Sequence, residues 1–188
     1  MSVNRKEFLK KACLAGVCMC GFSLPVLAAG NGAGKSASEN SSDDEKIFIR
    51  NWIGNLLNNL NADLDKSDLK AIIKKNAIIH FNDLKMNEML AEYIGQPEKF
   101  IAFISEKWGW KVEYDMATKT LTANENKTFC VCPVVNQTGA FKSAAICNCS
   151  EGFAEKMFST VFNSPASATV VSSVLRGDKN CVYKIIIS

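Results

Sequence analysis

Five cysteines in the second half of the chain carry its most distinctive chemistry. They are Cys130, Cys132, Cys147, Cys149 and Cys181. The first four form two Cys-x-Cys pairs, and this spacing puts both side chains of a pair on the same face of a β-strand. Thiols can bind a metal, form disulfides or act as nucleophiles, so the geometry that brings the pairs together decides their chemistry.

The two Cys-x-Cys pairs are predicted to face each other across a β-hairpin. Residues 129–135 and 140–149 have the pattern of strands, and Gln137-Thr138-Gly139 between them is typical of a turn. A register centred between Gly139 and Ala140 places Cys132 opposite Cys147 and Cys130 opposite Cys149. Directly opposed Cβ atoms lie about 5 Å apart. This hairpin would therefore crowd four thiols on one face.

The cysteine cluster has three interpretations. The one we favour is a metal site for zinc or an iron–sulfur cluster, with the two pairs as ligands and Cys181 as an auxiliary. The second is a pair of disulfides, Cys132–Cys147 and Cys130–Cys149, because exported proteins meet an oxidising compartment. The third is a catalytic or redox thiol, since an odd number of cysteines leaves one unpaired. A helix starting at Ser150 would favour the thiolate of Cys149.

Other candidate residues are few. His80 is the single histidine, so a Cys–His dyad could be built only on it. Four apolar side chains in residues 150–163 could line a pocket for a hydrophobic ligand or simply fill the core: Phe153, Met157, Phe158 and Phe162. We therefore expect the partner to be a small molecule or a metal ion, bound through the cysteine cluster.

The elements that must position these residues indicate an α+β fold. Residues 47–108 have helical periodicity, with an apolar stripe through Phe48, Trp52, Leu56, Leu60 and Leu64 and further helices starting near Ser67, Met86 and Pro97. Strands are expected at 110–115, 120–124, 168–175 and 181–187, with one helix inserted at 150–163. The prediction is N-terminal helices followed by a mainly antiparallel sheet with one inserted helix.

The N-terminus has the pattern of an export signal. Basic residues up to Lys11 precede an apolar run, Ala12–Leu27, and Val26 and Ala28 suit a cleavage site. The run is shorter than the roughly 20 residues that span a bilayer. Residues 4–10 resemble a twin-arginine motif with Lys6 as its second basic residue. We expect a signal peptide at 1–29, a flexible polar linker at 30–46 and one domain at 47–188, in the periplasm or outside the cell.

The charge balance excludes one class of partner. Residues 1–29 hold four basic residues and one acidic residue, so 18 of each sign remain from totals of 22 and 19. A neutral domain without a basic run argues against nucleic acid. After processing, we also expect no stable membrane span.

The C-terminal part resembles the 4-vinyl reductase domain family. The resemblance rests on Glu151-Gly152-Phe153, the helix after it, a strand, and Leu175-Arg176-Gly177-Asp178-x-x-Cys181. It implies a pocket for a small hydrophobic molecule over a sheet, and in some members zinc held by cysteines. Cys149 or Cys147, together with Cys181, would match two such ligands. The family's glutamate and middle cysteine fall near Val170 and Ser173, which cannot bind zinc.

Residues 100–188 are also similar to the L-2-amino-thiazoline-4-carboxylic acid hydrolase-like group. The similarity rests on Asn126–Pro133, which contains the first Cys-x-Cys pair, and on Cys147–Phe153, which contains the second. It implies a thiol-dependent hydrolase of a small ring amide or thiazoline-type substrate. No catalytic residue can be carried over from that group. The third alternative is a disulfide-stabilised module that binds a hydrophobic ligand.

Overall fold

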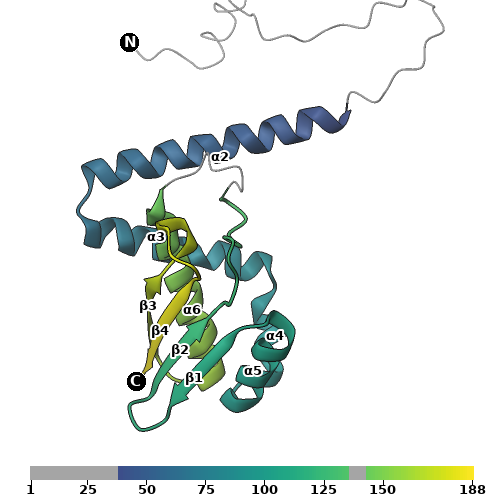
Figure 1. The fold of residues 1–188 in the computed structure, drawn as a ribbon, viewed down its shortest axis with the longest axis vertical. Coiled ribbons are helices and arrows are strands. Elements are labelled where there is room, and N and C mark those ends of the chain that lie inside the picture. The colour runs from purple at the N-terminus through teal and green to yellow at the C-terminus, as the bar shows by residue number, and fades with distance from the viewer. Residues whose placement is uncertain (1–37, 136–142) are drawn as a thin grey trace, which may run out of the picture. The chain divides into compact units, whose positions relative to one another are not determined.

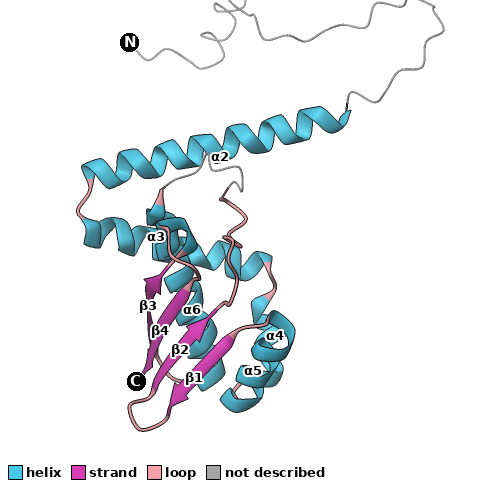
Figure 2. Cartoon of the chain, viewed as in Figure 1, coloured by secondary structure: helices cyan, strands magenta, loops and turns pink. Residues whose placement is uncertain are grey.

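The α+β prediction is confirmed by the computed structural model, which describes residues 38–135 and 143–188, with side chains from residue 44 onward. The helical half contains α2 (Ser38–Asp63), α3 (Lys66–Asp83), α4 (Met86–Leu90), η1 (Ala91–Tyr93), α5 (Pro97–Phe103) and the π-helical turn η2 (Ile104–Trp108). The second half contains β1 (Lys111–Asp115), β2 (Thr120–Asn124), η3 (Ala144–Ile146), α6 (Cys147–Phe162), β3 (Ala166–Ser172), η4 (Val174–Arg176) and β4 (Val182–Ile187). Figures 1 and 2 show this order.

Helix α2 differs from the prediction in its start and in its buried face. It begins at Ser38, so residues 38–46 of the expected linker are helical. The buried stripe passes through Ile53, Leu57, Leu60 and Leu64, whereas Phe48, Trp52 and Leu56 are exposed. The predicted signal peptide and the rest of the linker lie outside the described residues.

None of the described helices is both long enough and apolar enough to cross a bilayer.

The four strands form an antiparallel sheet in the order β1-β2-β4-β3. β2 pairs with β4 although some sixty residues separate them, and Ala123 lies opposite Tyr183. The ladder continues past β2, because the Glu125 N–H donates to the Cys181 carbonyl at 3.0 Å. Since alternate residues of a strand share a face, Leu121, Ala123 and Glu125 all point inward.

The predicted cysteine hairpin is wrong. Residues 129–135 form a loop, and Cys147 and Cys149 lie in the first turn of α6; the turn expected at Gln137–Ala140 falls outside the described residues. The buried positions of α6 begin with Cys147, Glu151, Ala154 and Phe158, a spacing of three and four that extends the helix upstream of Ser150. A Cys-x-Cys pair can occur in a strand or in a helical turn, so the pair alone does not distinguish the two. The buried positions at spacings of three and four identify this segment as a helix.

Helix α6 packs on one face of the sheet and forms the centre of the core (Figure 1). Its Met157, Phe158 and Val161 are fully buried together with Phe100, Ile104, Leu121 and Ile185. A smaller cluster joins α2 and α3 to the loop at 129–135 through Leu57, Leu69, Ile73 and Val135. Cys130, Cys132 and Cys149 pack against this second cluster. The N-terminal end of α6 is therefore enclosed by both clusters.

Candidate functional site: an apolar pocket lined by five thiols

A cavity of about 420 Å³ lies at the N-terminal end of α6. Its walls come from several parts of the chain: the segment Ile146–Met157 in η3 and α6, the ends of β2 and β4, Val170 and Ser173 in and after β3, the segment Trp108–Trp110, the junction of α3 and α4, and the loop 130–133. Most of the side chains that line it are apolar, including Met86, Phe153, Met157 and Val170. The cavity lies within the size range of small-molecule sites, which runs from about 300 to 1,000 Å³.

All five cysteines line this one cavity. The sequence predicted that they would gather, but through a different geometry. Cys147 and Cys149 come from α6, Cys130 and Cys132 from the loop that lies against it, and Cys181 from the residue before β4. All five are free thiols.

Burial keeps most of these thiols in the neutral form. It raises the pKa of Cys149 and of Cys181 to about 11, against 9.0 for an ordinary thiol. Burial also raises the pKa of Cys132 and of Cys147. The thiolate of Cys149, which the helix N-terminus was expected to favour, is instead disfavoured, because burial removes its hydration.

The described residues contain no group of three or more histidine, cysteine or acidic side chains arranged to hold a metal ion. The Cys147 thiol has a polar partner in the protein, since its Sγ lies 3.1 Å from the Ser173 hydroxyl. Ser173 is held in turn by Asp178, whose carboxylate accepts its backbone N–H at 2.8 Å. The Arg176-Gly177-Asp178 segment forms a turn, with Gly177 at a positive φ of 96°. The turn thus fixes a serine beside a thiol.

The aromatic candidates divide between the pocket and the core. Phe153 and Met157 line the cavity, whereas Phe158 packs on Phe100 and Phe162 on Tyr114. His80 also lines the cavity, where its ring contacts that of Phe153 with 5.0 Å between centroids. No described cysteine hydrogen bonds to its imidazole, so the arrangement does not contain a Cys–His dyad.

The sequence reasoning missed the most polar part of the pocket. Glu125 and Tyr183 are both buried and line the cavity, and the Tyr183 hydroxyl donates to Glu125 Oε1 at 2.6 Å. Burial raises the pKa of both groups. A signal for Glu125 was present, because an acidic residue there continues the inward alternation of Leu121 and Ala123. Its partnership with Tyr183 depends on pairing of distant strands, which local patterns do not reveal.

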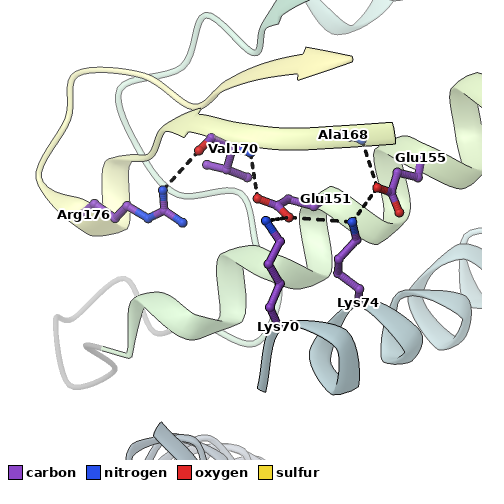
Figure 3. A network of polar contacts seen from close by, with 7 residues as sticks. All are labelled: Lys70, Lys74, Glu151, Glu155, Ala168, Val170 and Arg176. Atoms are coloured by element: carbon purple, nitrogen blue, oxygen red, sulfur yellow. Dashed lines mark hydrogen bonds and ion pairs between the residues drawn. The ribbon is translucent and has the colours of Figure 1, made fainter. Parts of the chain in front are cut away.

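A polar network on the opposite side of α6 fixes this helix beside the sheet (Figure 3). Glu151 accepts the Val170 N–H, Glu155 the Ala168 N–H and Ser159 the Ala166 N–H, each at 2.9 Å. Lys70 Nζ lies 2.7 Å from Glu151 Oε2, as an ion pair; that oxygen has no hydrogen-bond donor in suitable geometry among the described residues.

Gly152 permits the close approach of α3 that this network needs. A Cβ atom at Gly152 would lie 2.4 Å from the Lys74 carbonyl oxygen. The three residues of Glu151-Gly152-Phe153 therefore contribute differently, since Glu151 hydrogen bonds to the sheet edge, Gly152 allows the helices to pack and Phe153 lines the pocket.

The fold and the site together define an α+β domain with an apolar, cysteine-lined pocket. The chain belongs to DUF6144, a family of unknown function, which matches residues 31–188. No curated protein shows significant sequence similarity to it. A solved structure of trafficking protein particle complex subunit 3 from Naegleria fowleri, covalently bound to palmitic acid, aligns at 11% identity and a TM-score of 0.40. That alignment covers 78% of this chain and 96% of the other.

Proposed function

We propose that this domain binds a small, largely apolar molecule in the cavity at the N-terminal end of α6. The observation that carries the proposal is a cavity of about 420 Å³ lined mainly by apolar side chains. An apolar molecule bound there would gain dispersion contacts with these walls and remove their apolar surface from water. The neutral thiols add polarizable surface to the walls rather than charge.

The proposal is tested by titrating the full chain with the neutral dye N-phenyl-1-naphthylamine. We expect saturable binding with one site, and a Phe153→Ala variant that binds about tenfold more weakly because it loses lining contacts. Phe162→Ala is the matched control, since it alters the same helix and the same residue type outside the cavity. An absence of saturable dye binding to the folded wild-type chain would reject the proposal.

A second candidate is a metal site, zinc or an iron–sulfur cluster, held by thiols of the same pocket. The observation that favours it is that all five cysteines line one cavity. Its test is elemental analysis of the mature protein from its native compartment. Cys132→Ser and Cys149→Ser should each remove the metal, and an unchanged metal content in both would reject it. Thiol counting by mass spectrometry on the same sample separates metal-bound cysteines from disulfides.

A thiol-dependent hydrolase is the alternative that the thiol pKa values oppose. A rise from 9.0 to about 11 lowers the thiolate fraction of Cys149 and Cys181 about a hundredfold below pH 9. We expect both to react with iodoacetamide far more slowly than free cysteine at pH 8, as read by peptide mass mapping. A single thiol that reacts faster than free cysteine would favour the enzyme instead.

We propose export as the context of this function, on the strength of the N-terminal pattern alone. Mass spectrometry of the mature N-terminus should find cleavage after Ala28 or Ala29. Recovery of the intact chain from the cytoplasmic fraction only would contradict export.

A further inference from the structure

The pocket has one strongly polar point, the carboxyl group of Glu125. The residue is 6% exposed and lines the cavity. The Tyr183 hydroxyl donates to its Oε1, and no other side chain is seen to donate to this carboxyl group among the described residues. A carboxylate in an apolar cavity is costly unless a charge or further donors compensate it.

No described cation forms an ion pair with Glu125. The described ion pairs lie elsewhere, on Glu92, Glu106, Glu151 and Glu155. Lys127 is the basic residue that acts on Glu125 through its charge, but its ammonium donates to the Trp108 carbonyl at 3.2 Å. Within the described residues, Glu125 therefore lines the cavity without an ion-pair partner, and a cationic group on a bound ligand would supply one.

Aromatic rings surround the same part of the cavity. The rings of Trp110 and Tyr183 are nearly parallel, at 12° and 6.0 Å between centroids, and Trp108 meets Trp110 at 63° and 5.6 Å. All three line the cavity with Glu125. Indole and phenol rings attract cations through their negative faces, and such clusters are a recurrent way to bind alkylated ammonium groups.

We propose that the ligand is an organic cation: a protonated or quaternary amine on an apolar body, with its charge beside Glu125 and the Trp108–Trp110–Tyr183 rings and its body along Phe153 and Met157. This inference rests on the proposed binding function and names its ligand class. It follows from one buried acidic group, a rim of aromatic rings and walls that are otherwise uncharged. A carboxylate ligand would meet repulsion from Glu125, and a neutral hydrocarbon would leave that group uncompensated.

The test compares two probes of the same shape on the full wild-type chain. Benzyltrimethylammonium carries a positive charge, and neopentylbenzene is its neutral carbon isostere. In displacement of N-phenyl-1-naphthylamine, we expect the cation to bind at least tenfold more tightly than the isostere and 3-phenylpropanoate to bind most weakly. Equal or tighter binding of the neutral probe would overturn the cation inference and leave the pocket function intact. If neither the dye nor any probe binds, the pocket function itself fails.

A variant tests the role of Glu125 directly. Glu125→Gln keeps an acceptor for the Tyr183 hydroxyl but removes the negative charge, so benzyltrimethylammonium affinity should fall at least tenfold while dye affinity stays within twofold. Glu113→Gln, on an exposed position of β1, is the control and should change neither. Circular dichroism melting verifies that each variant is folded. If Glu125→Gln does not fold, the comparison of the two isosteric probes on the wild-type chain still tests whether the pocket prefers a cation.

Discussion

Two buried glutamates, Glu151 and Glu125, differ in the partners that the fold provides for their carboxylates. Glu151, 2% exposed, accepts a backbone N–H of β3 and has an ammonium group 2.7 Å from its other oxygen. Glu125, 6% exposed, has one hydrogen bond from a tyrosine and faces a cavity. The partners of Glu151 all belong to the fold, which makes it a structural residue. Glu125 has only the tyrosine as a partner, and we propose that the cationic group of a ligand is its second. The comparison separates a structural acid from a binding acid by their partners rather than by their burial.

Removal of Glu151 should give the largest effect. Glu151→Ala leaves the Val170 N–H without an acceptor and deprives Lys70 of its partner, so we expect a loss of about 3 kcal/mol in the free energy of unfolding. Urea denaturation measures it. Glu155→Ala, on the same network but more exposed, is the comparison and should cost less than half as much. A loss below about 1 kcal/mol for Glu151→Ala, the size of an ordinary hydrogen bond, would show that this acid is not structural.

Gly152→Ala should give the next largest effect. The added Cβ meets the Lys74 carbonyl oxygen, so α3 must move away and carry Lys70 from Glu151. Overpacking of this kind costs about 2 kcal/mol. At an unconstrained helical position the same change stabilises, by about 0.5–1 kcal/mol, so the sign of the change in urea midpoint tests the close approach. The hydrogen bond between Tyr183 and Glu125 involves neither α3 nor α6 and should be unaffected.

Lys70→Met should have a smaller effect. Lys70 is 39% exposed, so solvent screens its ion pair, and Lys74 lies 3.9 Å from the same Glu151 oxygen. We expect a loss of about 1 kcal/mol, reduced by added salt. Lys99→Met removes a well-exposed pair with Glu92 and should cost next to nothing. Equal losses in the two variants would mean that Glu151 does not need its ion pair.

Glu125→Gln should give the smallest effect and the opposite sign. Burial raises the pKa of Glu125 above 4.5, so the folded state binds its proton more tightly than the unfolded state does. Folding is therefore penalised as pH rises from about 4.5 through the folded pKa, and the penalty is absent at lower pH. The variant should be more stable than wild type by up to about 1 kcal/mol at pH 8 and equal to it near pH 4. Thermal melts across this range check the difference.

The sequence predicted the fold class and most elements, because helical stripes, alternating strands and Pro97 at a helix start are local signals. It misassigned the Cys-x-Cys segments, since a spacing of two residues fits both a strand and a helical turn. In α2 it was right about Leu60 and Leu64 but wrong to bury Phe48, Trp52 and Leu56, which are as apolar as the residues that are buried. Pattern alone cannot tell which of two apolar faces meets a partner.

The candidate site was predicted in part. The meeting of the two Cys-x-Cys pairs was expected, with Cys181 as an auxiliary, although from a hairpin that does not exist. The charge of the pocket was not foreseen, because Glu125 and Tyr183 are 58 residues apart and meet only through the β2–β4 pairing. The thiol pKa values were also beyond the sequence, since they follow from burial by segments that are distant along the chain.

The three hydrogen bonds from β3 amides to side chains of α6 affect which edge of the sheet can pair with another sheet. Four residues of a helix advance about 6 Å, and two residues of a strand advance about 6.7 Å, so acceptors at 151, 155 and 159 meet alternate amides along the edge. Side chains of α6, which packs on one face of the sheet, thus accept the outer amides of β3 and keep them from pairing with another strand. β1 is the other edge, and within the described residues no strand pairs with its outer side. A sheet open at one edge can pair with a single further sheet and then stops, whereas a fibre requires two open edges.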